Sequence, residues 1–178
     1  MEDREAKSIL EALLFISGEP LTIETLKDIV GIDENEAERL LRELSDEYQL
    51  RNRGLLIVEV AGGFQIVTNP ACAPWIKKFL NLTIPTRLSQ QSLETLAIVA
   101  YRQPVIKAEI DAIRGVDSGA ALKTILERRL INIVGRKEAP GRPFIYGTTR
   151  EFLRYFGLKD LSELPTLKEF QEVEGVEV

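Results

Sequence analysis

Residues 89–104 read SQQSLETLAIVAYRQP, residues 113–118 read IRGVDS, and residues 135–149 read GRKEAPGRPFIYGTT. In the first stretch Ser89 can cap the start of a helix. Pro104 ends that helix, because proline disfavours helical backbone in the residue before it. Apolar residues recur between them at intervals of three and four, which predicts a helix with one buried face: Leu93, Leu96, Ala97, Ala100 and Tyr101.

Two further helices and a hairpin are predicted after this helix. The second helix starts at about Lys107, carries Ile110 and Ile113 inward and ends at Gly115, and the third is capped by Asp117 or Ser118. Residues 130–134 and 144–146 are rich in β-branched and aromatic residues, and the Pro-Gly pair at 140–141 favours a turn between them. This order is typical of a winged helix-turn-helix. Thr148 and Glu151 suit the capping box of one more helix.

The same order occurs once before in the chain. A shift of 84 residues, without a gap across the three helices, brings Pro20 onto Pro104, Gly31 onto Gly115 and Asp33 onto Asp117. Coincidence is the alternative, but the match of turn residues favours a duplication. The earlier copy has helices at about 5–17, 22–30 and from 33, then a hairpin around Gly-Gly at 62–63. The sequence therefore predicts an α+β, mainly helical fold with two tandem winged-helix domains.

The domain boundaries follow from this repeat. We expect a first domain over residues 1–84, a second over 85–160, and an acidic, disordered tail over 161–178. One further turn is an alternative for residues 161–165, with disorder beyond residue 166. The run TIPTR at 83–87 is a candidate linker. The second unit is mildly basic, with 13 basic and 8 acidic side chains, whereas the first has 9 basic and 15 acidic side chains.

Composition argues against catalysis. The chain has no histidine and only one cysteine, Cys72, so neither a usual zinc site nor a Ser-His-Asp or Cys-His nucleophile can be assembled. We expect no cofactor, no metal and no small-molecule substrate. No apolar run approaches the roughly 20 residues that cross a bilayer, the first residues are acidic, and a lone cysteine suits a reducing cytoplasm.

Several long motifs resemble the family of segregation and condensation protein B, the bacterial condensin accessory subunit. The motifs lie between residues 88 and 158, and the first unit agrees with the family in length, element order and the run ILEALLF at 9–15. One departure is Arg129, where the resemblance leads us to expect glycine after the third helix. The motifs are LETLAIVAYRQPV at 93–105, IRGVDS at 113–118, GRK at 135–137, PGRP at 140–143, YGTT at 146–149, FL at 152–153 and YFGL at 155–158.

The resemblance implies a non-catalytic subunit that acts in chromosome condensation and segregation. It implies a homodimer formed largely through the first domain. It also implies binding of the kleisin subunit, segregation and condensation protein A, and we expect this binding mainly through the second domain. The kleisin in turn connects to an ATPase of the structural-maintenance-of-chromosomes (SMC) class, which carries the ATP chemistry. We expect a cytoplasmic, nucleoid-associated protein.

The predicted kleisin contacts lie within the motifs. Leu96, Ile98 and Val99 cannot all face one core, because neighbouring helix positions differ by about 100°. One of them should lie on a surface that takes a partner helix. For residues 101–104 the alternative is a plain helix end with Tyr101 in the core and Arg102 solvated. The full predicted set is Leu96, Val99, Tyr101, Arg102, Gln103, Pro104, Arg114 and Tyr146.

Two further surfaces are predicted. A two-fold dimer contact is expected at Trp75, Ile76, Phe79, Leu56 and Val58, with an ordinary core as the alternative. Basic residues at the second wing suit a DNA contact, although the modest charge favours a plain polar turn and weak or absent direct DNA binding. The rival function is a winged-helix DNA-binding transcriptional regulator. The basic residues are Arg136, Lys137 and Arg142.

Overall fold

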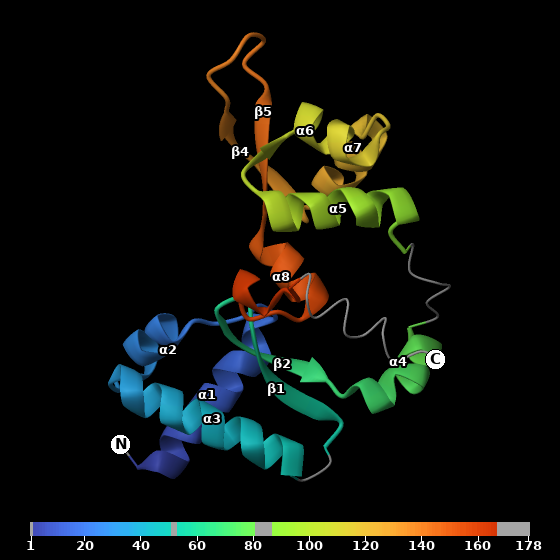
Figure 1. Ribbon diagram of the computed structural model, residues 1–178. Helices are drawn as coiled ribbons and strands as arrows, with labels where there is room; N and C mark the ends of the chain where they lie inside the picture. The colour runs from blue at the N-terminus through green and yellow to red at the C-terminus, as the bar shows by residue number, and fades with distance from the viewer. Residues whose placement is uncertain (1, 51–52, 81–86, 167–178) are drawn as a thin grey trace.

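The computed structural model describes residues 2–50, 53–80 and 87–166, which fold into two units (Figure 1). The first unit contains α1 (Asp3–Ser17), α2 (Ile23–Val30), α3 (Glu34–Leu50), β1 (Leu55–Val60), β2 (Gly63–Thr68), η1 (Pro70–Cys72) and α4 (Ala73–Phe79). The second contains α5 (Gln90–Arg102), β3 (Val105–Ile106), α6 (Lys107–Arg114), α7 (Gly119–Glu127), β4 (Ile131–Arg136), β5 (Phe144–Thr148), α8 (Arg150–Phe156) and η2 (Leu161–Glu163).

Each unit is a winged-helix domain, as the sequence predicts. Three helices precede an antiparallel hairpin, which is β1–β2 in the first unit and β4–β5 in the second. The segment after the first helix adds a short third strand in the second unit and a single bridge in the first. Val105 of β3 pairs with Tyr146 of β5, and Leu21 forms a single bridge with Phe64 of β2. Leu21 and Val105 lie 84 positions apart, so the internal repeat extends to this connection.

The two units have separate hydrophobic cores. Residues Ala6, Leu10, Leu14, Leu26, Leu40, Leu41, Leu44, Tyr48, Ile57 and Phe64 form the first core. Residues Leu88, Leu96, Val99, Ala100, Val105, Ile110, Leu122, Ile125, Leu130, Ile131, Tyr146 and Phe152 form the second. This separation agrees with two domains, but the boundary at 84/85 and linker residues 83–86 lie outside the described residues and stay a prediction.

The gapless alignment of the repeats is wrong over the first helix. α1 buries Ala6, Leu10 and Leu14, whereas α5 buries positions 92, 96 and 100, which lie 86 residues later. The connection from the first helix to the paired residue, which is Leu21 in the first unit and Val105 in the second, is therefore two residues shorter in the second unit. The predicted inward position of Ile113 is also wrong, because its side chain is exposed, as is that of Ile29 at the matching position of the first unit. Each eight-residue helix, α2 and α6, buries only one residue in its core.

The turn of the first hairpin is shifted by one residue from the prediction. Ala61 and Gly62 form the turn with φ of 51° and 71°, and Val60 pairs with Gly63. Two positive φ values in a two-residue turn match the right-handed twist of a hairpin. Gly63 instead begins β2. Only glycine fits at this position, because a Cβ would lie 2.6 Å from the Leu21 carbonyl oxygen.

The chain after the second wing also differs in detail. Thr149, not Thr148, caps α8 by accepting a hydrogen bond from the Phe152 N–H. Thr148 is instead the last residue of β5, and its N–H donates a hydrogen bond to Gln103 Oε1 at the end of α5. Residues 161–166 follow the alternative of one further turn, since they include η2 and Leu164 packs against the second core. Residues 167–178 lie outside the described part.

The first wing holds the two units together. The Ala61 and Gly62 N–H groups donate to the Leu158 and Lys159 carbonyls, each with an N···O distance of 2.9 Å. Arg150 Nη2 donates to the Ala61 carbonyl at 3.1 Å. The turn of the first wing is therefore engaged by the segment after α8, whereas the β4–β5 hairpin extends away from the helices (Figure 1).

Arg129 adopts the left-handed conformation that the expected glycine would adopt, with φ of 59°. This conformation costs a non-glycine residue roughly 1–2 kcal/mol, so Arg129→Gly should raise the stability by about 0.5–1 kcal/mol after the added freedom of the unfolded chain is subtracted. Thermal unfolding of the full chain measures the change. Arg128→Gly is the control, since Arg128 has φ of −80° and should only lose stability. Equal losses in both variants would contradict the explanation.

Candidate functional site

A hollow lies between α5 and α6, and we call it the α5–α6 hollow. Its volume is ≈ 410 Å³, and Ala97, Ile98, Tyr101, Arg102 and Ile113 line it. Ile98 is half-buried and packs against the edge of the second core, while the side chains around it are exposed. The hollow is therefore an apolar surface with a cation, Arg102, beside it.

The helical period explains why this surface exists. α5 turns Leu96 and Val99 into the core, where they are 1% and 0% exposed. Ile98 lies on another side of the helix, because adjacent positions differ by about 100°. Of the three apolar residues considered from the sequence, Ile98 is therefore the one at a surface. The predicted kleisin contacts Leu96 and Val99 are wrong, because side chains without exposed area cannot touch a partner.

Tyr101 lies at the rim of the hollow. Its side chain is exposed, which excludes the alternative that placed it in the core. Its hydroxyl donates to the Pro165 carbonyl with an O···O distance of 2.7 Å, so the segment after η2 lies beside this rim. Arg102 is solvent-exposed and forms no ion pair within the described ranges, which leaves its guanidinium available to a carboxylate.

Gln103 and Tyr146 both serve the internal structure of the second unit. Gln103 Oε1 accepts a hydrogen bond from the Thr148 N–H at 2.7 Å, and its Nε2 donates to the Thr148 hydroxyl at 2.9 Å. These bonds tie the end of α5 to β5. Tyr146 is buried among the residues of the second core. Tyr146 is therefore not placed to contact a partner. Gln103 is half-buried with its amide engaged by Thr148, and Pro104 is exposed.

Arg114 braces three helices from within. Its side chain is only 6% exposed, and Nη2 lies 3.4 Å from Glu94 Oε2 of α5. Nη1 donates to the Ser118 hydroxyl before α7 at 3.3 Å, while Nε has no hydrogen-bond partner in the structure. The predicted partner contact is therefore replaced by a structural role, because the charged end is turned into the protein.

An ion-pair cluster fixes the turn between α6 and α7. Lys107 Nζ lies 2.6 Å from Asp111 Oδ2 and also pairs with Asp117. Asp111 Oδ1 accepts the Ser118 N–H at 2.8 Å. The hydrogen bonds from Lys107 are the main cause that holds the pKa values of both carboxyl groups below their usual range. These charges compensate one another and serve the geometry of the turn.

α4 presents an unusually apolar surface. Trp75 is 71% exposed and Phe79 is 83% exposed, and α4 has no buried residue. A helix of seven residues is marginal in water without tertiary packing. We call the exposed Trp75 and Phe79, with Leu80, the α4 face. Ile76 is half-buried.

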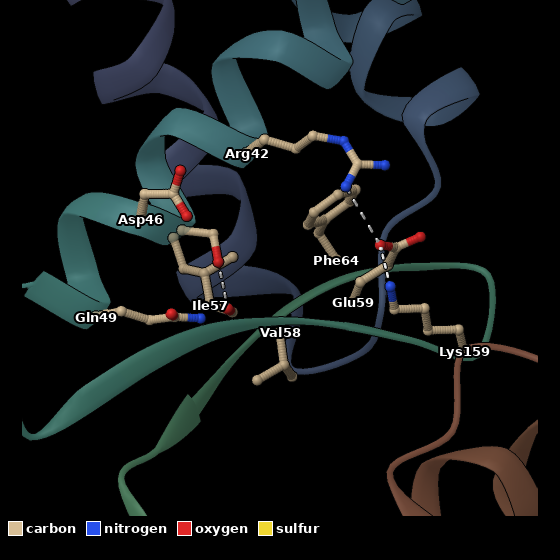
Figure 2. A pocket seen from close by; sticks show the side chains of 9 residues that line it. Arg42, Asp46, Gln49, Ile57, Val58, Glu59, Phe64 and Lys159 are labelled. Carbon is tan, nitrogen blue, oxygen red and sulfur yellow. Dashed lines mark hydrogen bonds and ion pairs between the residues drawn. The ribbon is translucent and has the colours of Figure 1, made fainter. Parts of the chain in front are cut away.

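The predicted dimer residues on β1 lie on one face of the first wing. Leu56 and Val58 are half-buried, and side chains alternate along a strand, so they point opposite to the buried Ile57. Figure 2 shows Val58 directed away from α3. The core alternative is therefore excluded for Trp75 and Phe79 and applies only in part to Leu56 and Val58.

A second apolar surface, which was not among the predicted sites, lies on α1. Its hollow has a volume of ≈ 570 Å³. Only Ala6, Leu10 and Leu14 of this helix are buried, so its other apolar residues lie outside the core. Two apolar stripes on one helix are the signal that could have revealed it. We call it the α1 face; it is lined by Ser8, Ile9, Ala12, Leu13, Phe15 and Ile16.

The basic residues of the second wing are engaged within the protein. Lys137 Nζ lies 2.7 Å from Glu109 Oε1, and this bond lowers the pKa of Glu109. The Arg136 guanidinium lies 4.1 Å from the centre of the Phe144 ring and donates to the Arg142 carbonyl. These contacts favour the polar-turn interpretation, because two of the three side chains have partners in the protein itself.

Figure 2 shows a further cleft, of ≈ 420 Å³, between α3 and β1. Glu59 is its central charge, and it lies 3.2 Å from Lys159 Nζ and 3.9 Å from Arg42 Nη1. The Ser45 hydroxyl donates to the Ile57 carbonyl at 2.8 Å. Glu59 therefore pairs with both cations that line the cleft, and Lys159 contributes to the junction of the two units.

Two kinds of site are absent from the described residues. Nowhere in residues 2–50, 53–80 and 87–166 do three or more Asp, Glu, Cys or His side chains gather as a metal site would require. In the same ranges, no helix combines the length and the apolar character that a membrane crossing needs.

Comparisons with known proteins agree on one family. The family model described as "Segregation and condensation complex subunit ScpB" matches residues 8–167. Segregation and condensation protein B of Desulforamulus reducens is 54% identical over 171 residues, covering 96% of this chain and 93% of the relative. The protein of the same name from Syntrophotalea carbinolica is 50% identical over 173 residues, covering 97% and 87%.

Two solved structures are also similar. The crystal structure of ScpB from Mycobacterium tuberculosis is 35% identical, covers 89% of this chain and 98% of that chain, and has a TM-score of 0.45. A crystal structure of a dimer of an ScpB N-terminal domain complexed with ScpA peptide is 34% identical and covers 43% of this chain and 95% of that chain, with a TM-score of 0.41.

Proposed function

Because this chain belongs to the family of segregation and condensation complex subunit ScpB, we propose that it is a non-catalytic, homodimeric subunit of the bacterial SMC–kleisin complex. It acts in chromosome condensation and segregation by binding the kleisin, which connects it to the SMC ATPase. Family membership over residues 8–167 supports this role. The absence of histidine from the sequence agrees with a role without catalysis.

The α5–α6 hollow is the proposed kleisin site. Its residues Ala97, Ile98, Tyr101 and Arg102 belong to the long motif at 93–105, and their exposed apolar surface is the observation that carries the assignment. A helix with apolar side chains at intervals of three and four would fit such a surface. Arg102 would pair with a carboxylate at the edge of that helix.

The first unit supplies the proposed dimer contact through the α4 face. A short helix that exposes Trp75 and Phe79 gains stability when a second copy covers it. Aromatic residues of this kind commonly dominate the energy of an interface. We therefore assign dimerisation to residues 1–84 and kleisin binding to residues 85–160. The proposed role in the chromosome-organising complex also makes this a nucleoid-associated protein of the cytoplasm.

Mixing the full chain with a full-length kleisin subunit tests the function. Size-exclusion chromatography with light scattering should show a dimer of this chain alone and a co-eluting complex with the kleisin. Separate elution at micromolar concentrations would contradict the proposal. We do not propose the rival role of transcriptional regulator, because the family matched over residues 8–167 is that of a segregation and condensation complex subunit. That role requires tight duplex binding that weakens steeply with salt.

A further inference from the structure

β4 is an open edge of the second sheet. The strand order is β3-β5-β4, so β4 is bonded on one side to β5. On its other side, no backbone hydrogen bond joins β4 to any of the described residues. Alternate N–H and C=O groups of an edge strand point outward and can pair with another chain. Figure 1 shows the β4–β5 hairpin extending beyond the helices of its unit.

The side chains along this edge are apolar and exposed. Val134 is 55% exposed, and Ile133 next to it is exposed as well. Proteins usually protect an open edge with inward-pointing charges, proline or a short strand. β4 has neither a charged residue nor a proline over residues 131–135. A register shift between Ile133 and Gly135 makes Val134 a bulged residue, and a bulge is itself one of the devices that protect an edge. A partner strand would therefore form its backbone pairs mainly over residues 131–133 and reach Val134 through side-chain contact.

Cations stand at both ends of the edge. Arg129 precedes β4, while Arg136 ends it and lies beside Arg142. Among the described residues these three arginines form no ion pair. An added strand would therefore be stabilised by carboxylates near its ends.

These features identify the occupant by its chemistry. We propose that β4 accepts an extended acidic segment of the kleisin, with apolar side chains beside Ile133 and Val134, as a fourth strand of the second sheet. This inference rests on the proposed function and adds a second contact to the α5–α6 hollow. A second copy of β4 fits less well, because β4 has no carboxylate and would bring its cations against those of its twin.

Hydrogen–deuterium exchange of the full chain, alone and with full-length kleisin, tests the inference. Co-elution first establishes that the complex forms. Backbone amides within residues 131–136 should then exchange roughly tenfold more slowly in the complex, because opening of the added strand must precede exchange. A formed complex with unchanged exchange over β4 would overturn this inference and leave the proposed function standing. If no complex forms, both fail.

Two other occupants give different results. If the β4 amides of the protein alone exchange slowly at high concentration and faster after dilution, the edge is occupied by a second copy. Slow exchange caused by a 20-base-pair DNA duplex of random sequence, but not by the kleisin, would assign it to a nucleic acid (the duplex length follows roughly two helical turns). Either result overturns the inference.

A matched pair of variants examines the same edge by affinity. Val134→Glu should weaken kleisin binding roughly tenfold, because it removes an apolar contact and repels an acidic segment. Val116→Glu is the control, since Val116 is 57% exposed in the turn after α6, close to the 55% of Val134. Val134→Lys should lose less than Val134→Glu. Equal binding by Val134→Glu and Val116→Glu, with equal thermal stability, would also overturn the inference.

Discussion

Ala97→Asp should lower the affinity for the kleisin by about a hundredfold, which corresponds to roughly 2.7 kcal/mol. Ala97 lines the α5–α6 hollow and is exposed, so the variant should fold. Binding of the partner would bury the new carboxylate against apolar side chains without a hydrogen-bond partner, and such burial costs about 1–3 kcal/mol or more. Isothermal titration calorimetry of the full chain with the kleisin measures the loss of affinity.

Two variants make this result specific. Ala12→Asp places the same change on the exposed α1 face and should leave kleisin binding unchanged, although both variants carry the same loss of helix propensity. Leu96→Asp lies one position from Ala97 but introduces a charge into the second core, so it should unfold the second unit rather than act on binding. Loss of binding in Ala12→Asp alone would move the kleisin site to the first unit.

Phe79→Asp should convert the dimer into a monomer at micromolar concentration. Phe79 is among the most exposed aromatic residues of the described chain, and α4 has no buried residue that would suffer from the change. Loss of an aromatic anchor at the centre of an interface commonly costs 2 kcal/mol or more, and a desolvated carboxylate adds to this cost. Sedimentation velocity over a concentration series measures the shift.

Phe15→Asp is the matched control for this variant. Phe15 is exposed on the α1 face, so the same substitution there tests the other apolar surface of the first unit. If Phe15→Asp dissociates the dimer and Phe79→Asp does not, the α1 face is the dimer contact. Dissociation by neither variant would exclude both surfaces as dominant contacts.

Local interactions explain which parts of the fold were predictable. Ser89 caps α5 by accepting the Ser92 N–H, and Gly31 and Gly115 end α2 and α6 with positive φ. These features depend on residues within one helical turn, so sequence spacing is sufficient to locate them. Arg129 shows the limit of this reasoning, because its backbone keeps the left-handed conformation although the side chain disfavours it.

The functional surface was only partly predictable. The motif at 93–105 located the correct helix, but the predicted contacts included Leu96 and Val99, which are buried, beside Tyr101 and Arg102, which are exposed. Arg114 was predicted to contact the kleisin, but its side chain is buried and pairs with Glu94 of the same unit. The exposed side of a helix depends on which elements pack against it, and this is a long-range property.

The sequence by itself determined the family, the duplicated order of three helices and a hairpin, and the lack of residues for the usual zinc or nucleophile chemistry. These properties depend on residue identity and on short-range periodicity. Only the tertiary structure decided that Ile98 and Ile113 meet in one hollow, that the first wing joins the two units, and that β4 has an open edge. Each of these depends on segments that approach one another from different places in the chain, and their packing, not their local pattern, leaves a side chain or strand edge uncovered.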